Sequence, residues 1–283
     1  MTGDSGSGRQ QSREDHSQPA TTPGDSSSPS WLETNLAGPA GGPANITPAS
    51  LLEQALADRQ RQGDLAGQAQ VLARLAVARY AAGDASGAGE AAAECVRAAS
   101  LAGDRHGWPW AVLIQALLAY DRDDLDEALA RAGEALDLFR ASGDTAHVWR
   151  ATMTCMLVTK SLGRLMEARD YCLETIDLVE ECGDEEMATA LPELAAVVLA
   201  LGDTPEAVVV YSAGLTAAER LGVRYPPTAF DRYRARIARA RSRLPEAEFA
   251  AARAEGEALS LGEALEQVRR SVSSGRGRTT LPA

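Results

Sequence analysis

The chain has 283 residues and a formal net charge of −12 at pH 7, so its overall potential disfavours a general phosphate or nucleic-acid binder. Hydrophobic residues make up 45% of the sequence but aromatic residues only 5%. Small apolar side chains suit close helix packing better than a pleated sheet, so the composition predicts an all-α fold. The N-terminus has no apolar signal segment, and no apolar run is long enough to span a bilayer. Together these features predict a cytoplasmic protein without a membrane partner.

Residues 1–47 are rich in Ser, Gly, Pro and Thr and have almost nothing to bury, which predicts a disordered N-terminal tail. One island in this tail, Ser30–Leu36, has the Ser-x-x-Glu spacing of a capping box and two leucines one helical turn apart. Its centre, Trp31 and Leu32, is either a short docking motif or a chance match. Chance matches are the commoner outcome for motifs of this length.

From about residue 48 the pattern becomes that of amphipathic helices, and turn residues recur at a fixed period. One series steps by 40, 40, 40 and 39 residues: Gly63, Gly103, Gly143, Gly183 and Gly222. A second series lies midway between them and steps by 40, 40 and 39 residues: Gly83, Asp123, Gly163 and Gly202. Glycine tolerates the left-handed conformation that ends a helix, and four glycines of the first series precede an aspartate that can cap the next helix. Two interleaved series therefore predict repeats of two helices each.

Small residues recur at fixed offsets from the second series of turns. Alanine follows each of these turn residues by five positions: Ala88, Ala128, Ala168 and Ala207. The ninth position after each turn residue holds Ala92, Ala132, Cys172 and Tyr211, and a slot before the turns holds Ala76, Ala116, Met156 and Ala195. These positions fall on one helical face, where small side chains let neighbouring helices approach closely.

This pattern resembles the tetratricopeptide repeat, whose consensus places alanine, an aromatic residue and alanine at similar offsets after a glycine-containing turn. The resemblance implies a right-handed α-solenoid of about five helix-turn-helix repeats within residues 48–222. Four repeats hold their phase: 63–102, 103–142, 143–182 and 183–221. The period of 40 residues exceeds the family's usual value of about 34 and is near that of HEAT and armadillo arrays, which are the alternative fold.

Residues 223–270 are expected to form a terminal helical pair, followed by a disordered tail over residues 271–283. Part of this segment, Pro245–Glu266, is similar to the C-terminal end of bacterial regulators of the signal-transduction ATPase class, whose repeat arrays finish with an A-E-G-x-A-L-S-L sequence. That resemblance implies a sensor or docking arm. The sole lysine, Lys160, lacks the glycine pattern of a phosphate loop, so the ATPase role is not carried over. The DNA-binding role is not carried over either, because no segment outside the array is long and structured enough for a helix-turn-helix domain.

The first helix of each tetratricopeptide repeat lines the concave face, which is the usual binding surface of a solenoid. Mapping that face onto this sequence gives a largely apolar row with aromatic anchors and a pair of cations. The predicted groove residues are Tyr80, Trp110, Leu113, Leu117, Tyr120, Arg150, Met153, Leu157 and Lys160. We expect the groove to bind a protein or peptide that carries an apolar anchor and an acidic group. Packing against neighbouring helices is the alternative role of the same residues.

Six arginines fall between residues 232 and 243, which makes this the most basic helix of the chain. Four of them share one helical face: Arg232, Arg236, Arg239 and Arg243. Reading bases needs aromatic or polar side chains, and only Tyr233 is near, so no nucleic-acid partner is expected. Pairing with the acidic fourth repeat, or exposure to solvent, is the expected state of these arginines.

Catalysis is not expected. His106 and His147 lie about one repeat apart, but no third ligand or nucleophile shares their spacing, so no metal site and no cofactor is predicted. The cysteines form no C-x-x-C pair and are expected to be buried, reduced thiols: Cys95, Cys155, Cys172 and Cys182. The sequence therefore predicts a non-catalytic binding scaffold with a regulatory role. The alternatives are a sensor arm that binds a small molecule in the same groove, or a stand-alone relative of a transcriptional regulator.

Overall fold

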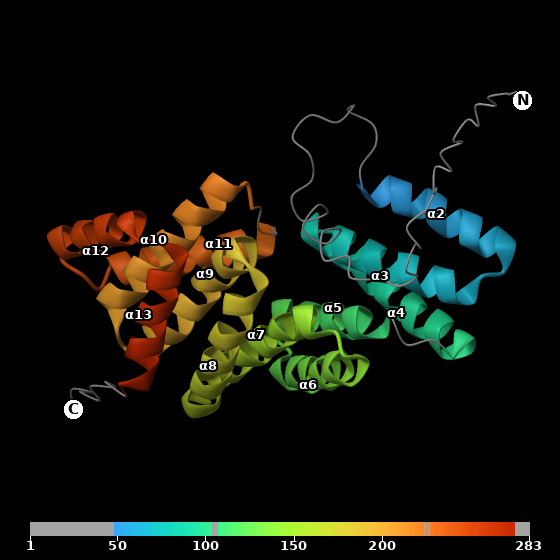
Figure 1. Cartoon of the computed structure of the whole chain (residues 1–283), viewed down its shortest axis with the longest axis horizontal. Helices are drawn as coiled ribbons and strands as arrows, with labels where there is room; N and C mark the ends of the chain where they lie inside the picture. The colour runs from blue at the N-terminus through green and yellow to red at the C-terminus, as the bar shows by residue number, and fades with distance from the viewer. Residues whose placement is uncertain (1–47, 104–106, 224, 226, 275–283) are drawn as a thin grey trace, which may run out of the picture.

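A computed structural model describes residues 48–103, 107–223, 225 and 227–274. Within these ranges the chain forms twelve helices and no strand, which confirms the all-α prediction (Figure 1). None of these helices is long and apolar enough to cross a membrane. The predicted Trp31–Leu32 island, His106 and most of both predicted tails lie outside the described residues.

The helices follow one another along the chain with short turns between them. They are α2 (Pro48–Gln62), α3 (Leu65–Ala81), α4 (Ala85–Ala102), α5 (Trp108–Asp121), α6 (Leu125–Ser142), α7 (Thr145–Ser161), α8 (Leu165–Cys182), α9 (Asp184–Ala200), α10 (Thr204–Leu221), α11 (Pro227–Arg241), α12 (Glu246–Ala258) and α13 (Leu261–Ser273).

Adjacent helices pack in pairs, α3 with α4, α5 with α6, α7 with α8 and α9 with α10. The first helices of successive pairs also contact one another, α3 with α5, α5 with α7 and α7 with α9. The second helices of these pairs make no comparable contacts within the described ranges. The pairs are therefore closer together on the side of the first helices. We call the side formed by α3, α5, α7 and α9 the inner face. This arrangement is compatible with a helical repeat array.

The turns behave as their spacing predicts. Every described residue with a positive φ belongs to one of the two turn series, and Asp123, at φ 62°, is the one that is not glycine. The capping prediction holds in part. Asp64 caps α3 by accepting a hydrogen bond from the Gly67 amide, whereas Asp144 makes no such cap. Asp184 is the first residue of α9, where its charge still suits the positive helix end.

The small-residue slots lie where the helices approach most closely. The four alanines five positions after the second-series turns are fully buried: Ala88, Ala128, Ala168 and Ala207. Met156, the large exception in the slot before the turns, is also fully buried. A substitution that enlarges one of the alanines must therefore displace a neighbouring helix, because protein interiors have no spare volume at such contacts.

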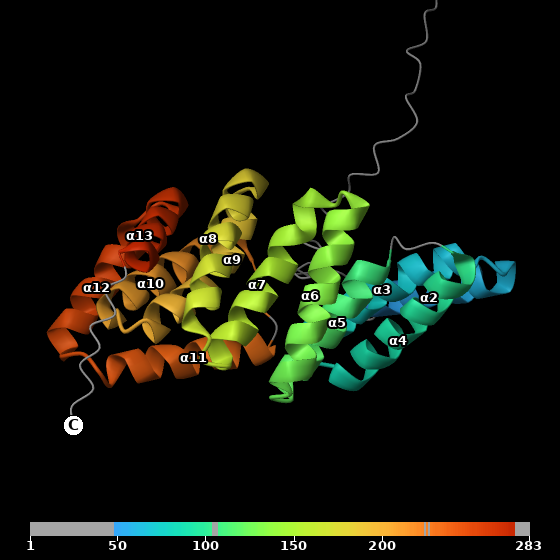
Figure 2. The same cartoon turned by 90° about the horizontal axis from the view of Figure 1, so that it is seen from below.

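The C-terminal segment differs from the expected helical pair, because it contains three helices and the last of them continues to Ser273. α12 packs on α10, as the first helix of each pair packs on the second helix of the pair before it, but it makes no comparable contact with the preceding first helix, α9, within the described ranges. A Cβ atom on Gly256 would lie 2.1 Å from the Val209 carbonyl oxygen, so only glycine permits this approach of α12 to α10. α13 lies along α8, α9 and α10. α12 and α13 therefore do not continue the array as a further regular pair, and the main helix contacts of α11 are with α9 and α10. Figure 2 shows α11 running across α7 and α9 along one side of the molecule.

Candidate binding pocket on the inner face

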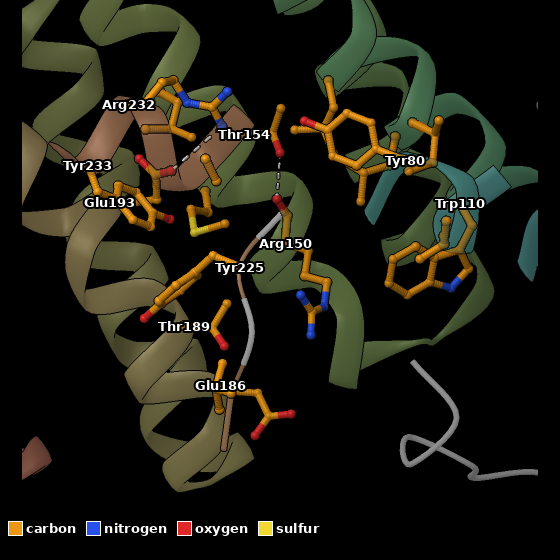
Figure 3. Close-up of a pocket in the computed structure, with 18 of the residues that line it drawn as sticks. Tyr80, Trp110, Arg150, Thr154, Glu186, Thr189, Glu193, Tyr225, Arg232 and Tyr233 are labelled. Atoms are coloured by element: carbon orange, nitrogen blue, oxygen red, sulfur yellow. Dashed lines mark hydrogen bonds and ion pairs between the residues drawn. The ribbon is translucent and has the colours of Figure 1, made fainter. Parts of the chain in front are cut away.

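A pocket opens on the inner face, where α3, α5, α7 and α9 face α11 and the segment that precedes it (Figure 3). It holds about 1050 Å³ of space not filled by protein atoms, its open mouth included. Its lining is mostly apolar, and seven of the predicted groove residues belong to it: Tyr80, Trp110, Leu113, Leu117, Arg150, Met153 and Leu157.

Trp110 forms part of one wall and is also packed into the core, since only 7% of its surface is exposed. Its ring meets Phe139 and His147 edge-on, with centroid distances of 5.4 and 4.8 Å. The His147 Nδ1 lies 2.7 Å from a carboxylate oxygen of Asp144. His147 is thus a packing residue behind the tryptophan. No group of three potential ligands that could hold a metal is present in the part of the chain that the structure describes.

The opposite wall depends on a proline inside α9. Pro192 has no amide hydrogen, so the carbonyl of Ala188, four residues earlier, lacks its helical donor. The Tyr225 hydroxyl donates to this carbonyl at 2.9 Å. The rings of Tyr225 and Tyr233 meet at right angles, with centroids 5.0 Å apart, and both residues line the pocket. Burial raises the pKa of both phenols, which therefore remain neutral. The segment before α11 is held on α9 by this contact.

An ion-pair network attaches α11 to the inner face. Glu193 in α9 is 3% exposed and accepts from the Arg236 guanidinium at 2.6 Å, while Arg232 approaches it to 4.0 Å. Arg232 also pairs with Asp121 at the end of α5, at 2.6 Å, and the Tyr80 hydroxyl donates to the same aspartate at 3.0 Å. Burial raises the pKa of the Glu193 carboxyl, but the two guanidinium groups outweigh it, so the pKa lies below the ordinary value. This carboxylate is therefore ionised at neutral pH.

The four predicted arginines of the basic helix separate into two groups. Arg236 pairs with Glu193 of the fourth repeat, as expected, whereas Arg232 pairs most closely with Asp121 of the second repeat and approaches Glu193 only to 4.0 Å. Arg239 and Arg243 are exposed. The inward arginines make α11 a wall of the pocket, since Arg232, Tyr233 and Ala229 are all among its lining residues.

Tyr120 and Lys160 do not line the pocket, unlike the other predicted groove residues. They lie in the last turns of α5 and α7. Lys160 is ten residues beyond Arg150 on the same helix, which separates their Cα atoms by about 15 Å. Of the two cations predicted for the middle of the groove, Arg150 lines the pocket and Lys160 does not. At the rim of the pocket, Arg150 is accompanied instead by the carboxylates of Glu185 and Glu186.

Sequence reasoning missed several pocket residues, among them Glu193, Tyr225 and Glu186. Two signals for them were present. Glu193 is the only charged residue in the apolar run 187–201, which is typical of a carboxylate with a buried partner. Pro192 within a helical pattern leaves a carbonyl that requires a donor from elsewhere. Neither signal identifies the partner, because α11 reaches its contacts across large sequence separations.

None of the four cysteines is among the residues that line the pocket. Cys95, Cys155 and Cys172 are buried, as expected, and burial raises the pKa of each thiol to about 12. Cys182 is partly exposed and donates a hydrogen bond to the Leu178 carbonyl. None of the four cysteines forms a disulfide with another described residue.

No protein-family model matches this chain, and a search of curated proteins finds no similar sequence. The likeness to a repeat family therefore depends on the turn series and on the packing of helices in successive pairs.

Proposed function

We propose that this chain is a non-catalytic binding module, a right-handed solenoid of tetratricopeptide type with about five repeats, and that the inner-face pocket is its ligand site. One observation carries the proposal. Seven residues that the repeat phase predicts to face a common groove, from α3, α5 and α7, line a single mostly apolar pocket. A regulatory role in the cytoplasm belongs to the same proposal, through the likeness of residues 245–266 to the ends of regulator arrays.

The partner that fits best is a protein or peptide segment with a large apolar anchor. Tyr80, Trp110, Met153 and Leu157 offer aromatic and flexible apolar surface for such a side chain. Because α11 occupies the inner face beside α9, an extended segment has room only over the part formed by α3, α5 and α7. We therefore propose that the partner inserts one anchor residue here, and does not run along the whole array.

The rim of the pocket adds an electrostatic requirement. Figure 3 shows the side chain of Arg150 in the space between Tyr225 and Trp110, with the Glu186 carboxylate below Thr189 at the edge of the same group of residues. Glu185 lies beside Glu186 in the first turn of α9. Both signs of charge thus flank the apolar site, and a segment with charged groups of both signs next to its anchor suits it better than a purely acidic one.

A small amphipathic molecule is the second candidate. The observation that favours it is the enclosure of the pocket on a third side by α11 and Tyr225, which an open peptide groove does not have. Small-ligand sites are typically concave, mostly apolar and supplied with a few polar groups, and this pocket has all three properties.

Two matched methionine substitutions test the site. Met153→Arg places a charge in the pocket, whereas Met166→Arg places the same charge at a methionine that is 63% exposed. We expect peptides selected from a display library on the full-length protein to bind the wild-type and Met166→Arg chains equally and the Met153→Arg chain at least about tenfold more weakly. Mass spectrometry of extracts from all three purified proteins examines the small-molecule candidate. Equal binding of every selected ligand to a folded Met153→Arg chain would show that the pocket is not the binding site.

A further inference from the structure

α2 has the place of a second helix in the array, but the described residues contain no first helix to pair with it. It lies at one end of the molecule (Figure 2) and packs on α3 as α4 packs on α5. Gly63 follows the end of α2 as Gly103 follows the end of α4. One period before Gly83, the second turn series reaches position 43, directly after Gly42. A first helix for α2 would therefore fall within residues 1–47.

The apolar side of α2 is only partly covered. Leu52 and Ala55, nine and twelve residues after position 43, are half-buried. In the four complete pairs, the Cys95 position shows how these slots are filled. The Cys95 Sγ lies 3.2 Å from the Ala69 carbonyl oxygen in α3 and 3.5 Å from the Gly107 carbonyl oxygen before α5, so a first helix lies on each side of it. α2 has only α3. The buried equivalents are Ala92, Ala132, Cys172 and Tyr211 at the ninth position and Cys95, Ala135, Thr175 and Gly214 at the twelfth.

α3 is more open on one side than the later first helices. Val71 is half-buried, whereas its equivalents in α5, α7 and α9 have no exposed surface: Ala111, Ala151 and Ala190. Each of those three helices contacts a preceding first helix, and α3 has no such neighbour among the described residues. α2 and α3 therefore share an uncovered surface at the N-terminal end of the array. We call it the end face, formed by Leu52, Ala55 and Val71.

The leucines of the Ser30–Leu36 island have the spacing that the end face requires. Leu32 and Leu36 stand eleven and seven residues before position 43. The residues at these distances before the turns of the second series are all buried. They are Leu72, Val112, Thr152 and Leu191 at eleven residues and Ala76, Ala116, Met156 and Ala195 at seven.

The last complete pair gives the contact to expect. A Cβ atom on Gly214 in α10 would lie 2.8 Å from the Leu191 Cβ in α9. Gly214 is the equivalent of Ala55, and Leu191 is the equivalent of Leu32. The same packing would place the side chain of Leu32 directly on Ala55.

We propose that residues 30–37 form a short helix that covers the end face, as the truncated first helix of a terminal repeat. Leu32 and Leu36 supply its apolar side, and the Ser-x-x-Glu spacing supplies its N-terminal cap. The connection over residues 38–47 spans up to about 33 Å, whereas turns of three residues suffice in the other pairs. The proposal depends on the repeat phase and not on the ligand of the inner-face pocket.

Disulfide formation in the full-length chain tests this contact. Cys182→Ser removes the native thiol that is only partly buried. In this background, Leu32→Cys with Ala55→Cys is compared with Thr34→Cys with Ala55→Cys. The two pairs close loops of nearly equal length, but Thr34 lies about 200° around a helix from Leu32. A disulfide needs Cβ atoms about 3.5–4.5 Å apart, so we expect oxidised glutathione to link positions 32 and 55 at least about tenfold faster than positions 34 and 55.

Equal rates for the two pairs, or no linkage in either, would overturn the proposal, because proximity along the chain alone would then set the rate. A third chain, Leu32→Cys with Met153→Cys, examines the inner-face pocket as the alternative site. Faster linkage in this chain would show that the segment binds the pocket, and a disulfide-linked dimer as the main product would assign the end face to a second copy. Either result would also overturn the proposal.

Discussion

Replacement of Glu193 by glutamine tests whether the ion-pair network holds α11 on the inner face. The side chain keeps its shape and can still accept a hydrogen bond, but the negative charge between Arg236 and Arg232 is removed. Arg232 retains Asp121 as a partner, whereas Arg236 loses Glu193, the one carboxylate among the described residues that pairs with it, at 2.6 Å. The substitution therefore leaves one guanidinium group inside the protein without a counter-charge.

The size of the effect follows from the burial of this pair. The side chains of Arg236 and Glu193 are only 14% and 4% exposed. Breaking a buried pair by removing one partner typically costs about 3–5 kcal/mol. Because Arg236 retains some access to water, we expect the lower end, about 3 kcal/mol, which lowers the melting temperature by about 6–12 °C in a domain of this size.

The assay combines urea unfolding, followed by circular dichroism, with limited trypsin digestion. Trypsin cleaves after arginine, and α11 is rich in arginine, so its cleavage reports local opening of this helix. We expect cleavage in α11 to be accelerated by up to about 100-fold, the factor that corresponds to about 3 kcal/mol if opening is confined to this helix. Replacing the pair by Glu193→Leu with Arg236→Met should restore most of the stability, because an apolar pair needs no counter-charge.

Glu257→Gln is the control for this experiment. It breaks a Glu–Arg pair with the same 2.6 Å distance, to Arg253, but the two side chains are 43% and 65% exposed. An exposed pair of this kind contributes about 0.5 kcal/mol or less. If Glu193→Gln changes the urea midpoint and the cleavage rate no more than Glu257→Gln does, the network does not hold α11 in place.

Acid should reproduce part of the same effect. The folded-state pKa of Glu193 is depressed, because the two arginines outweigh the opposing effect of burial. A depressed carboxyl pKa contributes stability that is present above the unfolded value of about 4.3 and is lost as the pH falls through the folded value. Stability profiles between pH 7 and pH 3 should therefore fall less steeply for Glu193→Gln than for the wild-type chain.

Three further predictions concern the core, one turn and the thiols. Ala128→Leu should lower the free energy of unfolding by about 1–3 kcal/mol, since Ala128 is fully buried. Glu134→Gln on the surface should lower it by far less. An unchanged urea midpoint for Ala128→Leu would contradict the repeat alignment. Asp123→Gly should raise stability by up to about 1 kcal/mol, because glycine adopts φ 62° without strain, and a lower urea midpoint would contradict this. A disulfide reagent should label Cys182 in the folded protein and the three buried thiols only after unfolding; four equal labelling rates would refute their burial.

The repeat period made the helices and turns predictable, because a left-handed turn residue and a small helix-contact residue have local requirements that the sequence states directly. Gly163 and Ala168 illustrate this, since the first has a φ of 75° and the second is fully buried. The same phase predicted most of the pocket wall, because Trp110 and Arg150 occupy equivalent positions in successive repeats. The repeat period therefore predicts the part of the fold in which each helix contacts the helices next to it in the sequence.

α11 was not predictable on these grounds, since its position depends on contacts between distant segments. Arg232 pairs with Asp121, 111 residues earlier, and no local pattern connects them. The helical content of α11 was evident from its sequence, but its displacement from the array was not. Lys160 was assigned to the groove with Arg150, although of these two residues only Arg150 lines the pocket.

The long-range contacts of α11 and α13 also affect how the molecule unfolds. A stack in which each helix contacts only its neighbours can lose its pairs one at a time. Arg232 joins α11 to α5, and Arg269 in α13 joins Asp177 and Glu180 in α8, so the helices from α5 to α13 are cross-linked by ion pairs in addition to their packing. At the other end, α2 packs mainly on α3. Amide hydrogen exchange should therefore reveal one slow, cooperative unit from α5 onward, preceded by a segment whose protection decreases toward α2.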